Sequence, residues 1–231
     1  MCSIRSRLAM TLGLLGVTAL AGALVGVPAG SAQKIVQRYS APLPQVVEPA
    51  APIVVDTPTN LQTAFTREMN AKQRYVAFAQ CADREGYPAV ARLFRACAQA
   101  EQVHANEHVH AIAWNGREAK AMLERLGVGT TAENLRTAID SETYEVTTFY
   151  PALLERARSD RQPMAVRSMT FALSAEREHV ALLTAALASL DQRPPAPRIY
   201  VCPLCGKTVE SLDFRKCPNC FTAAKRFIRE T

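Results

Sequence analysis

Aromatic residues are scarce in this chain of 231 residues, since they make up 6% of it and include a single tryptophan. Alanine is abundant instead, which is typical of closely packed helices and argues against a β-sandwich. A concentrated basic segment is also missing. The formal charge of +6 is spread along the chain, so the sequence gives little support for nucleic-acid binding.

Charged residues are absent from Leu8 to Ala32, directly after Arg5 and Arg7. This pattern predicts an export signal over residues 1–32, with two small-residue motifs between positions 27 and 32 that a signal peptidase could cut. An uncleaved anchor in the inner membrane is the alternative, because the apolar run is about long enough to span a bilayer. Either way, we expect the folded part outside the cytoplasm, in the periplasm or exported. There is no Arg-Arg pair of the twin-arginine type.

Large apolar residues are few in residues 33–58, which contain five prolines and predict an extended tether. Helical periodicity of the apolar residues then begins and continues over residues 59–191, in four stretches. A proline-rich spacer separates this predicted bundle from a small cysteine-rich domain over residues 198–231.

Local motifs predict where these helices begin, break and end. Thr59-x-x-Gln62 and Thr130-x-x-Glu133 match capping boxes, and Pro163 suits the first turn of the last helix. Residues 116–129 predict a longer connection with room for a short helix. Pro151 removes an amide donor inside the third helical stretch, so we expect a kink or bulge one turn beyond Glu145.

Acidic residues occupy central positions on the otherwise apolar stripes of all four predicted helices. Two of them have a histidine three residues later, and residues at that spacing are about 60° and 4.5 Å apart on a helix, so both can reach one ion. Several carboxylates facing one core would cost many kcal/mol without cations. The pattern predicts a dinuclear metal site inside a four-helix bundle, built from Glu68, Glu101, His104, Glu142, Glu145, Glu176 and His179.

A solvated surface of glutamate and histidine is the competing interpretation, and Glu145 is the residue for which it is strongest. Imidazole combined with carboxylates suits iron, manganese or zinc. His108 and His110 are interpreted as surface or supporting groups rather than ligands.

Four cysteines near the C-terminus predict a second metal site. Cys202-x-x-Cys205 and Cys217-x-x-Cys220 suit one tetrahedral ion, either a structural zinc or an iron that cycles by one electron. For Cys81 and Cys97, two small buried residues are favoured over a disulfide.

The chain resembles the rubrerythrins from Asn60 to its C-terminus. The matching stretches include Asn60-Leu61-Gln62-Thr63-Ala64-Phe65, Ala100-Glu101-Gln102-Val103-His104-Ala105 and Glu142-Thr143-Tyr144-Glu145-Val146. The resemblance implies an all-α ferritin-like four-helix bundle with a non-haem di-iron centre, followed by a rubredoxin-like domain with an Fe(Cys)4 site. The chain departs from the family pattern at Phe221, where a small residue is usual, and in its export leader.

The resemblance also implies roles for individual residues. Glu145 matches the additional carboxylate of rubrerythrins, and one iron moves in the family between the positions of His104 and Glu145. Tyr75 and Tyr150 match tyrosines that hydrogen-bond the carboxylates. The remaining predicted di-iron ligands are Glu68, Glu101, Glu142, Glu176 and His179.

Reduction of hydrogen peroxide to water, with electrons supplied singly through the four-cysteine iron, is the expected activity. A homodimer that brings this iron close to the partner's di-iron centre is expected from the same resemblance. An iron-binding or ferroxidase protein without peroxide turnover is the alternative, and zinc in the cysteine site would make that domain structural. The sequence does not name the electron donor, for which a quinol or a cytochrome is a hypothesis.

Overall fold

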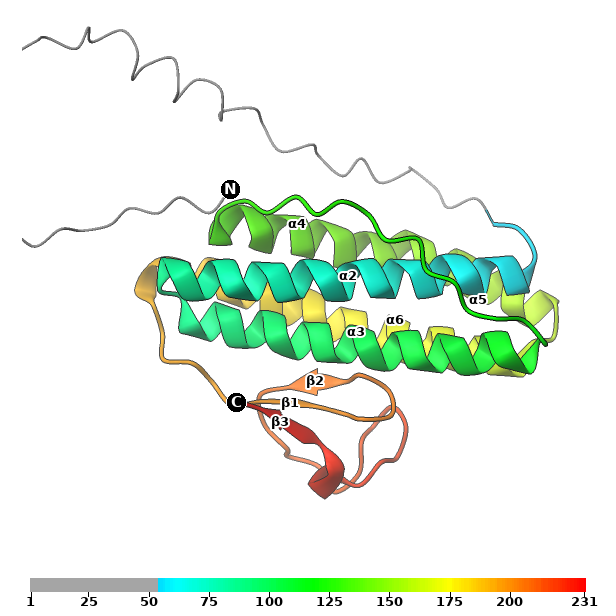
Figure 1. The fold of residues 1–231 in the computed structure, drawn as a ribbon. Helices are drawn as coiled ribbons and strands as arrows, with labels where there is room; N and C mark the ends of the chain where they lie inside the picture. The colour runs from blue at the N-terminus through cyan, green and yellow to red at the C-terminus, as the bar shows by residue number, and fades with distance from the viewer. Residues whose placement is uncertain (1–53) are drawn as a thin grey trace, which may run out of the picture. The chain divides into compact units, whose positions relative to one another are not determined.

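A computed structural model describes residues 54–231, so the predicted leader and most of the tether lie outside the described residues. Four helical segments form an antiparallel bundle, in which the third is interrupted by a π-helical turn (Figure 1). Of the helices in residues 54–231, none combines the length and the apolar character that a membrane crossing needs. The four segments are α2 (Thr57–Glu85), α3 (Pro88–Trp114), the interrupted helix formed by α4 (Thr131–Tyr144), η2 (Glu145–Phe149) and α5 (Tyr150–Ser159), and finally α6 (Pro163–Ala188).

The N-cap of the first helix lies three residues earlier than predicted. Asp56 is the N-cap and accepts a hydrogen bond from the amide of Thr59 at 3.0 Å, with Pro58 in the first turn. The capping box predicted at Thr59 is therefore wrong: Thr59 lies inside the helix, and its own amide is one of the free first-turn amides that Asp56 caps. The capping box at Thr130 and the start of α6 at Pro163 are both confirmed.

The irregularity expected near Pro151 is the π-helical turn η2. The amide of Tyr150 bonds to the carbonyl of Glu145, five residues back, and Pro151 has no amide to continue the α-helical pattern. The turn begins at Glu145 itself, slightly before the predicted position. It widens the helix at the point where that carboxylate enters the bundle.

The connection between α3 and α4 follows the surface along α2 and contains no helix (Figure 1). Asn70 holds it on both sides, because its amide donates to the carbonyl of Met122 at 3.1 Å and its oxygen accepts from the amide of Glu124 at 3.0 Å. These side-chain bonds replace the hydrogen bonds that a short helix would make.

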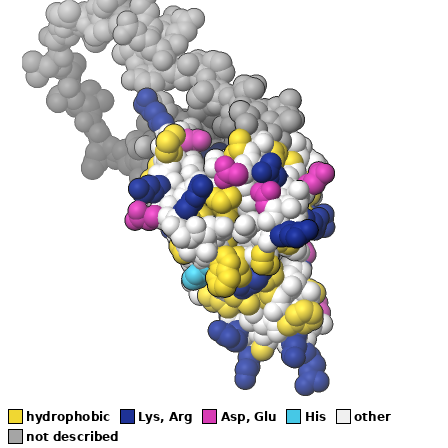
Figure 2. Space-filling view, turned by 90° about the vertical axis from the view of Figure 1, so that its right-hand side faces the viewer, with side chains coloured by type: hydrophobic (Ala, Val, Ile, Leu, Met, Phe, Trp, Pro, Cys, Tyr) yellow, Lys and Arg dark blue, Asp and Glu magenta, His cyan; other side chains and the backbone are white. Residues whose placement is uncertain are grey.

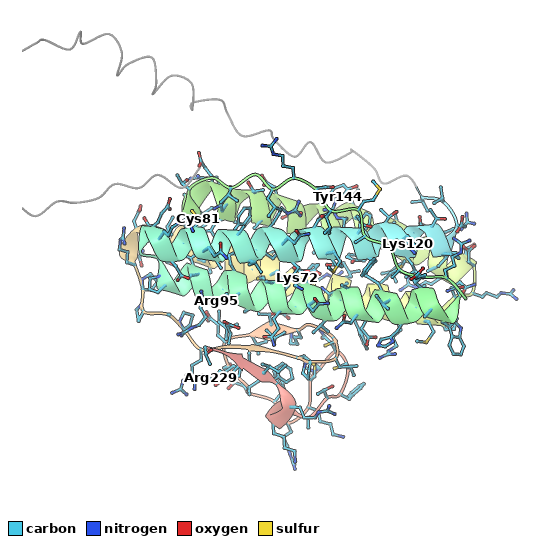
Figure 3. All side chains as sticks on the ribbon, in the orientation of Figure 1. Lys72, Cys81, Arg95, Lys120, Tyr144 and Arg229 are labelled. Carbon is cyan, nitrogen blue, oxygen red and sulfur yellow. The ribbon has the colours of Figure 1, made fainter. Side chains whose placement is uncertain are left out.

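The cysteine-rich domain contains an antiparallel sheet in the order β2-β1-β3, made of β1 (Ile199–Val201), β2 (Thr208–Val209) and β3 (Ile228–Glu230). Ile199 and Val201 are fully buried in the same apolar core as residues of α2 and α3. Arg95, on the side of α3 nearest the sheet (Figure 3), donates to Glu230 at 3.2 Å. The domain is thus packed on the helical bundle of its own chain.

The outer surface carries mixed charge. On the face shown in Figure 2, basic and acidic side chains lie beside one another over the helical part. This agrees with the absence of a basic block from the sequence.

Candidate metal centres

All seven residues predicted for the dinuclear site lie in the interior of the bundle, with between 0% and 3% of each exposed. Helical geometry explains the arrangement, since the middles of α2, α3 and α6 and the junction of α4 with η2 converge on one region of the core. A solvated glutamate and histidine surface is therefore wrong for this chain. The seven residues are Glu68, Glu101, His104, Glu142, Glu145, Glu176 and His179.

Six of the seven form two overlapping groups, each with four potential ligand atoms within 4.8 Å of one another. One group is Glu68, Glu101, His104 and Glu176, and the other is Glu101, Glu142, Glu176 and His179. Glu101 and Glu176 belong to both groups, which is the arrangement expected of carboxylates that bridge two ions. Glu145 belongs to neither group.

Several buried polar atoms in these groups have no hydrogen-bond partner, among them both carboxylate oxygens of Glu176 and Nδ1 of His179. Nδ1 of His179 nevertheless lies 2.6 Å from Oε2 of Glu176. Atoms that crowd together without hydrogen bonding, in a site closed to water, fit a shared cation. Imidazole and carboxylate donors in this number suit two divalent ions of the iron, manganese or zinc type.

The charges of the cluster shift its proton affinities strongly. Burial, followed by the charge of Glu176, raises the pKa of Glu101 to about 7. Burial and the same neighbour raise the pKa of Glu142 well above its usual range. Burial opposes ionisation of Glu176 too, but the adjacent His104 and His179 lower its pKa to about 2. Protons thus supply part of the neutralising charge in the metal-free cluster, and metal binding must displace them.

Two buried tyrosines hold outer carboxylate oxygens. Tyr75 donates to Oε1 of Glu142, and Tyr150 donates to Oε1 of Glu68. These are the contacts that the resemblance implied.

His108 extends the network around Tyr150. It is fully buried, with Nε2 3.0 Å from the Tyr150 hydroxyl and Nδ1 3.1 Å from the hydroxyl of Ser168. Of the two roles interpreted for His108, the surface role is wrong and the supporting role fits its contact with Tyr150, while nothing in the sequence indicated Ser168. His110 is exposed.

Glu145 is paired with a cation of the protein. Nε of Arg67 donates to its Oε1 at 2.9 Å, and Arg67 directly precedes the predicted ligand Glu68 on α2. No sequence pattern indicated Arg67, because the pairing joins residues 78 positions apart.

The four cysteines of the C-terminal domain also converge. Their sulfur atoms lie within 4.8 Å of one another, with Cys202 and Cys220 3.5 Å apart and Cys205 and Cys217 3.6 Å apart. A hydrogen bond from Cys205 lowers the pKa of the Cys202 thiol to about 5. This geometry suits one tetrahedral ion.

The two cysteine knuckles share one backbone pattern. The amide of Gly206 bonds to the carbonyl of Cys202 at 3.1 Å, and the amide of Phe221 bonds to that of Cys217 at 2.9 Å. Gly206 and Phe221 both have a left-handed backbone, with φ of 73° and 63°. Phe221 therefore keeps the knuckle geometry, although a residue with a β-carbon is strained there.

The first knuckle contacts the predicted histidine ligands of the same chain. A β-carbon added to Gly206 would overlap the imidazole of His104, so the two are in close contact. Nε2 of His179 lies 3.1 Å from Oγ1 of Thr208, whose hydroxyl donates to the carbonyl of Gly206. These contacts join segments 29 or more positions apart, and no local sequence pattern indicated them.

Among the cysteines of residues 54–231, Cys81 and Cys97 form no disulfide. Both are fully buried, as expected from their positions on helix faces, and the Cys81 thiol donates to the carbonyl of Gly129 at 3.2 Å. Burial raises the pKa of the Cys97 thiol to about 12, so it stays protonated.

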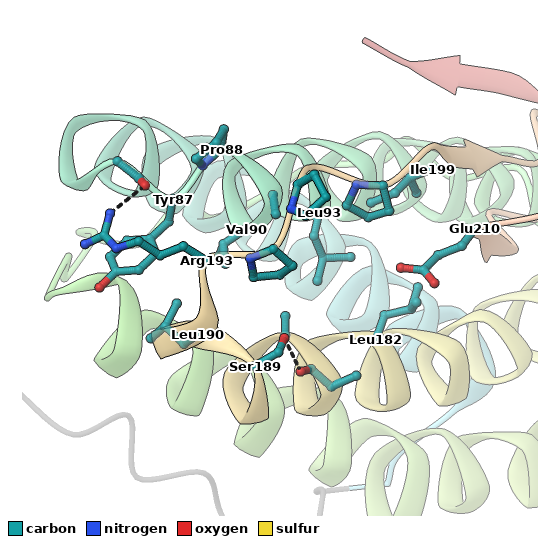
Figure 4. A pocket seen from close by; sticks show the side chains of 17 residues that line it. Tyr87, Pro88, Val90, Leu93, Leu182, Ser189, Leu190, Arg193, Ile199 and Glu210 are labelled. Atoms are coloured by element: carbon teal, nitrogen blue, oxygen red, sulfur yellow. Dashed lines mark hydrogen bonds between the residues drawn. The ribbon is translucent and has the colours of Figure 1, made fainter.

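A cavity of about 270 Å³ lies at the N-terminal end of α3, between Tyr87, Leu182 and the prolines that lead to β1 (Figure 4). Arg193 lines it, donates to the carbonyl of Gly86 and lies over the ring of Tyr87. None of the predicted metal ligands lines this cavity, so it is separate from the buried cluster.

Comparisons with known proteins agree with a helical bundle that holds a buried carboxylate cluster and is followed by a four-cysteine domain. The rubrerythrin family model matches residues 59–187. Nigerythrin of Nitratidesulfovibrio vulgaris is 33% identical over 75% of this chain and 86% of its own length, and rubrerythrin-2 of Clostridium acetobutylicum is 30% identical over 72% and 92%. A structure of nigerythrin in a partially reduced state covers 90% of this chain and 100% of its own, with 29% identity and a TM-score of 0.72.

Proposed function

The chain belongs to the rubrerythrin family, and on that premise we propose that it is a di-iron peroxidase, which reduces hydrogen peroxide to water in oxidative-stress defence. The reaction consumes two electrons and two protons for each peroxide and yields two waters. Iron in the buried carboxylate cluster supplies the redox chemistry. The observation that carries the proposal is the direct contact between the cysteine domain and both histidines of that cluster.

The protein's own groups prepare the site for this chemistry. The Thr208 hydroxyl donates to a carbonyl, so it accepts from Nε2–H of His179 and leaves Nδ1 of that ring free to bind a metal. Tyr75 and Tyr150 stabilise the carboxylate charge by hydrogen bonding. The closed apolar surroundings keep bulk water away from the reacting groups.

The cysteine site supports electron supply over a purely structural role. Its first knuckle reaches His104 and His179 within one chain, so a short covalent and hydrogen-bonded route leads from Cys205 towards the carboxylate cluster. Transfer inside one chain requires no partner subunit. The homodimer remains a prediction, which light scattering tests directly.

Anaerobic mixing tests the peroxidase. Fully reduced, iron-loaded protein is mixed with one equivalent of hydrogen peroxide, and the iron absorption is followed by stopped flow. We expect oxidation much faster than the same protein shows with dioxygen. Oxidation at the dioxygen rate contradicts the proposal. Iron uptake beyond the two sites, together with a large assembly, would then favour the ferroxidase alternative.

We also propose that the folded part lies outside the cytoplasm, on the basis of the leader predicted over residues 1–32. A quinol or a cytochrome would then be the class of electron donor. Fractionation of cells that express the full chain, with detection of the C-terminal domain, tests the location. Recovery in the cytoplasmic fraction contradicts it.

A further inference from the structure

We propose that Arg67 is a positioning residue that holds the carboxylate of Glu145 away from the metal, so that the ion must compete with a guanidinium for this ligand. This role rests on the proposed function, in which iron occupies the carboxylate cluster. It identifies the group that determines when Glu145 is released.

Several contacts fix the position of the Arg67 guanidinium. Its carbon lies 5.1 Å from the centre of the Tyr144 ring and 5.1 Å from the centre of the Phe149 ring, at the two ends of the π-helical turn. Nη2 also donates to the Ser141 hydroxyl at 3.3 Å. A cation stacked on aromatic rings and joined to a carboxylate has little freedom to move.

The carboxylate has few alternatives to this cation. Glu145 is 3% exposed, so water does not stabilise its charge, and burial raises its pKa well above the usual range while Arg67 acts in the opposite direction. Because Glu145 is absent from both groups of converging ligands, the observed arrangement is one in which the protein cation, and not the cluster, holds this acid.

Competition follows from charge. When Glu145 turns to a metal ion, its ion pair with Arg67 is stretched and two positive charges face one carboxylate. Arg67 therefore opposes coordination by Glu145, and a more highly charged ion overcomes this opposition more readily. Removal of the guanidinium should strengthen metal binding at the position nearest Glu145 and favour the oxidised centre.

Manganese titration tests this inference without any turnover. Mn²⁺ prefers oxygen ligands and avoids the cysteine site, and the EPR signal of the free ion reports binding. For Arg67→Gln we expect the weaker-bound Mn²⁺ to bind about tenfold more tightly than in wild type, the scale of one charge-assisted pair. Arg74→Gln is the matched control, because Arg74 lies on the same helix and contacts the same Ser141 hydroxyl at 3.2 Å.

A double-variant comparison separates positioning from general electrostatics. In a Glu145→Gln background, Arg67→Gln should leave Mn²⁺ affinity unchanged. The same substitution should also leave the reduction potential of the iron-loaded centre unchanged in that background. In the wild-type background, Arg67→Gln should lower that potential more than Arg74→Gln does. Equal effects of the two arginine variants, or an Arg67 effect that survives in the Glu145→Gln background, overturn the inference.

Arg67→Lys decides the question if Arg67→Gln does not fold. It keeps the charge but loses the Nε donor, so we expect Mn²⁺ to bind roughly two- to threefold more tightly. Unchanged binding overturns the inference. Because neither titration uses peroxide, a protein that lacks peroxidase activity still gives a readable result. Conversely, an active protein without the Mn²⁺ effect contradicts the role of Arg67 alone.

Discussion

Nε2 of His179 donates a hydrogen bond of 3.1 Å to the hydroxyl of Thr208, which joins the buried carboxylate cluster to the cysteine domain. The bond has two consequences. It orients the imidazole so that Nδ1 faces Glu176, and it connects this ring to the knuckle that carries Cys205. Both depend on one hydroxyl group of β2.

Thr208→Val removes that hydroxyl while preserving the shape of the side chain. We expect electron transfer from the cysteine iron to the oxidised carboxylate site to slow by about tenfold or more, which is typical when a partner of a metal-bound histidine is lost. Absorption of the ferric cysteine site, followed after one equivalent of peroxide, measures the rate. Thr208→Ser retains the hydroxyl and should remain close to wild type. Equal rates in the valine and serine variants would show that the bond does not contribute.

Gly206→Ala should separate the cysteine domain from the helical bundle. The added methyl group meets His104 and also strains a backbone with φ of 73°. Gly116→Ala is the matched control, because Gly116 has φ of 68° but no atom within 4 Å of the added group. We expect the control to lose about 1 kcal/mol of stability from backbone strain alone, and Gly206→Ala to lose clearly more.

Thermal unfolding measures both glycine variants. Protection of the His104 region from hydrogen exchange provides a second measurement, since it should fall only when the knuckle is displaced. Equal loss of stability in the two variants would mean that the knuckle does not press on His104 in solution.

Local features of the sequence predicted much of the architecture. Thr130 and Glu133 cap a helix with groups three residues apart, and Pro151 interrupts one through its missing amide. The ferritin-like fold, the four-cysteine domain and the family are confirmed by the structure and the comparisons. Each of these predictions depended on spacing along the chain or on a stretch of matching residues.

Contacts between distant segments could not be predicted in the same way. In the sequence, Arg67 cannot be distinguished from an exposed basic residue, because only the fold brings Glu145 to it. Thr208 likewise resembles an ordinary strand residue, because its contact with His179 forms only where β2 meets α6. Asp56 lay in the segment interpreted as tether, so its capping role was missed. The partners of Arg67 and Thr208 come from tertiary contacts, and the role of Asp56 comes from competition between neighbouring residues for the N-cap position. The periodicity of apolar residues contains neither kind of information.

Phe221→Gly should stabilise the cysteine domain. Phe221 is 74% exposed, so its ring contributes little burial, whereas its left-handed backbone carries a strain that glycine avoids. We expect a gain of about 1 kcal/mol, measured as slower loss of the metal-dependent absorption on heating with a chelator. Phe221→Ala keeps the strain and serves as the control. A faster loss in the glycine variant would indicate that the exposed ring has a partner.

Removal of the metals should make stability decrease as pH rises. Glu101, with a folded pKa of about 7, and Glu142, also raised, bind protons more tightly when folded than when unfolded. Although burial opposes it, the surrounding negative groups raise the pKa of His104 and His179 well above the usual range, so these rings also hold protons in the folded state. More protons bound to the folded protein means that unfolding becomes easier with rising pH, by up to about 1.4 kcal/mol per pH unit for each proton.

The loss should begin near the ordinary carboxylate pKa of 4.5 and continue through pH 7 and above as the histidines release their protons. Urea unfolding of chelator-treated protein at pH 5, 6, 7 and 8 measures the slope. Glu101→Gln should flatten it between pH 5 and 7, because an amide does not titrate. Mn²⁺ should reverse it, since the ion replaces the protons and binds better as they leave. Stability that rises with pH in the metal-free protein would mean that the buried acids are held by protein cations alone, without the protons that a metal has to displace.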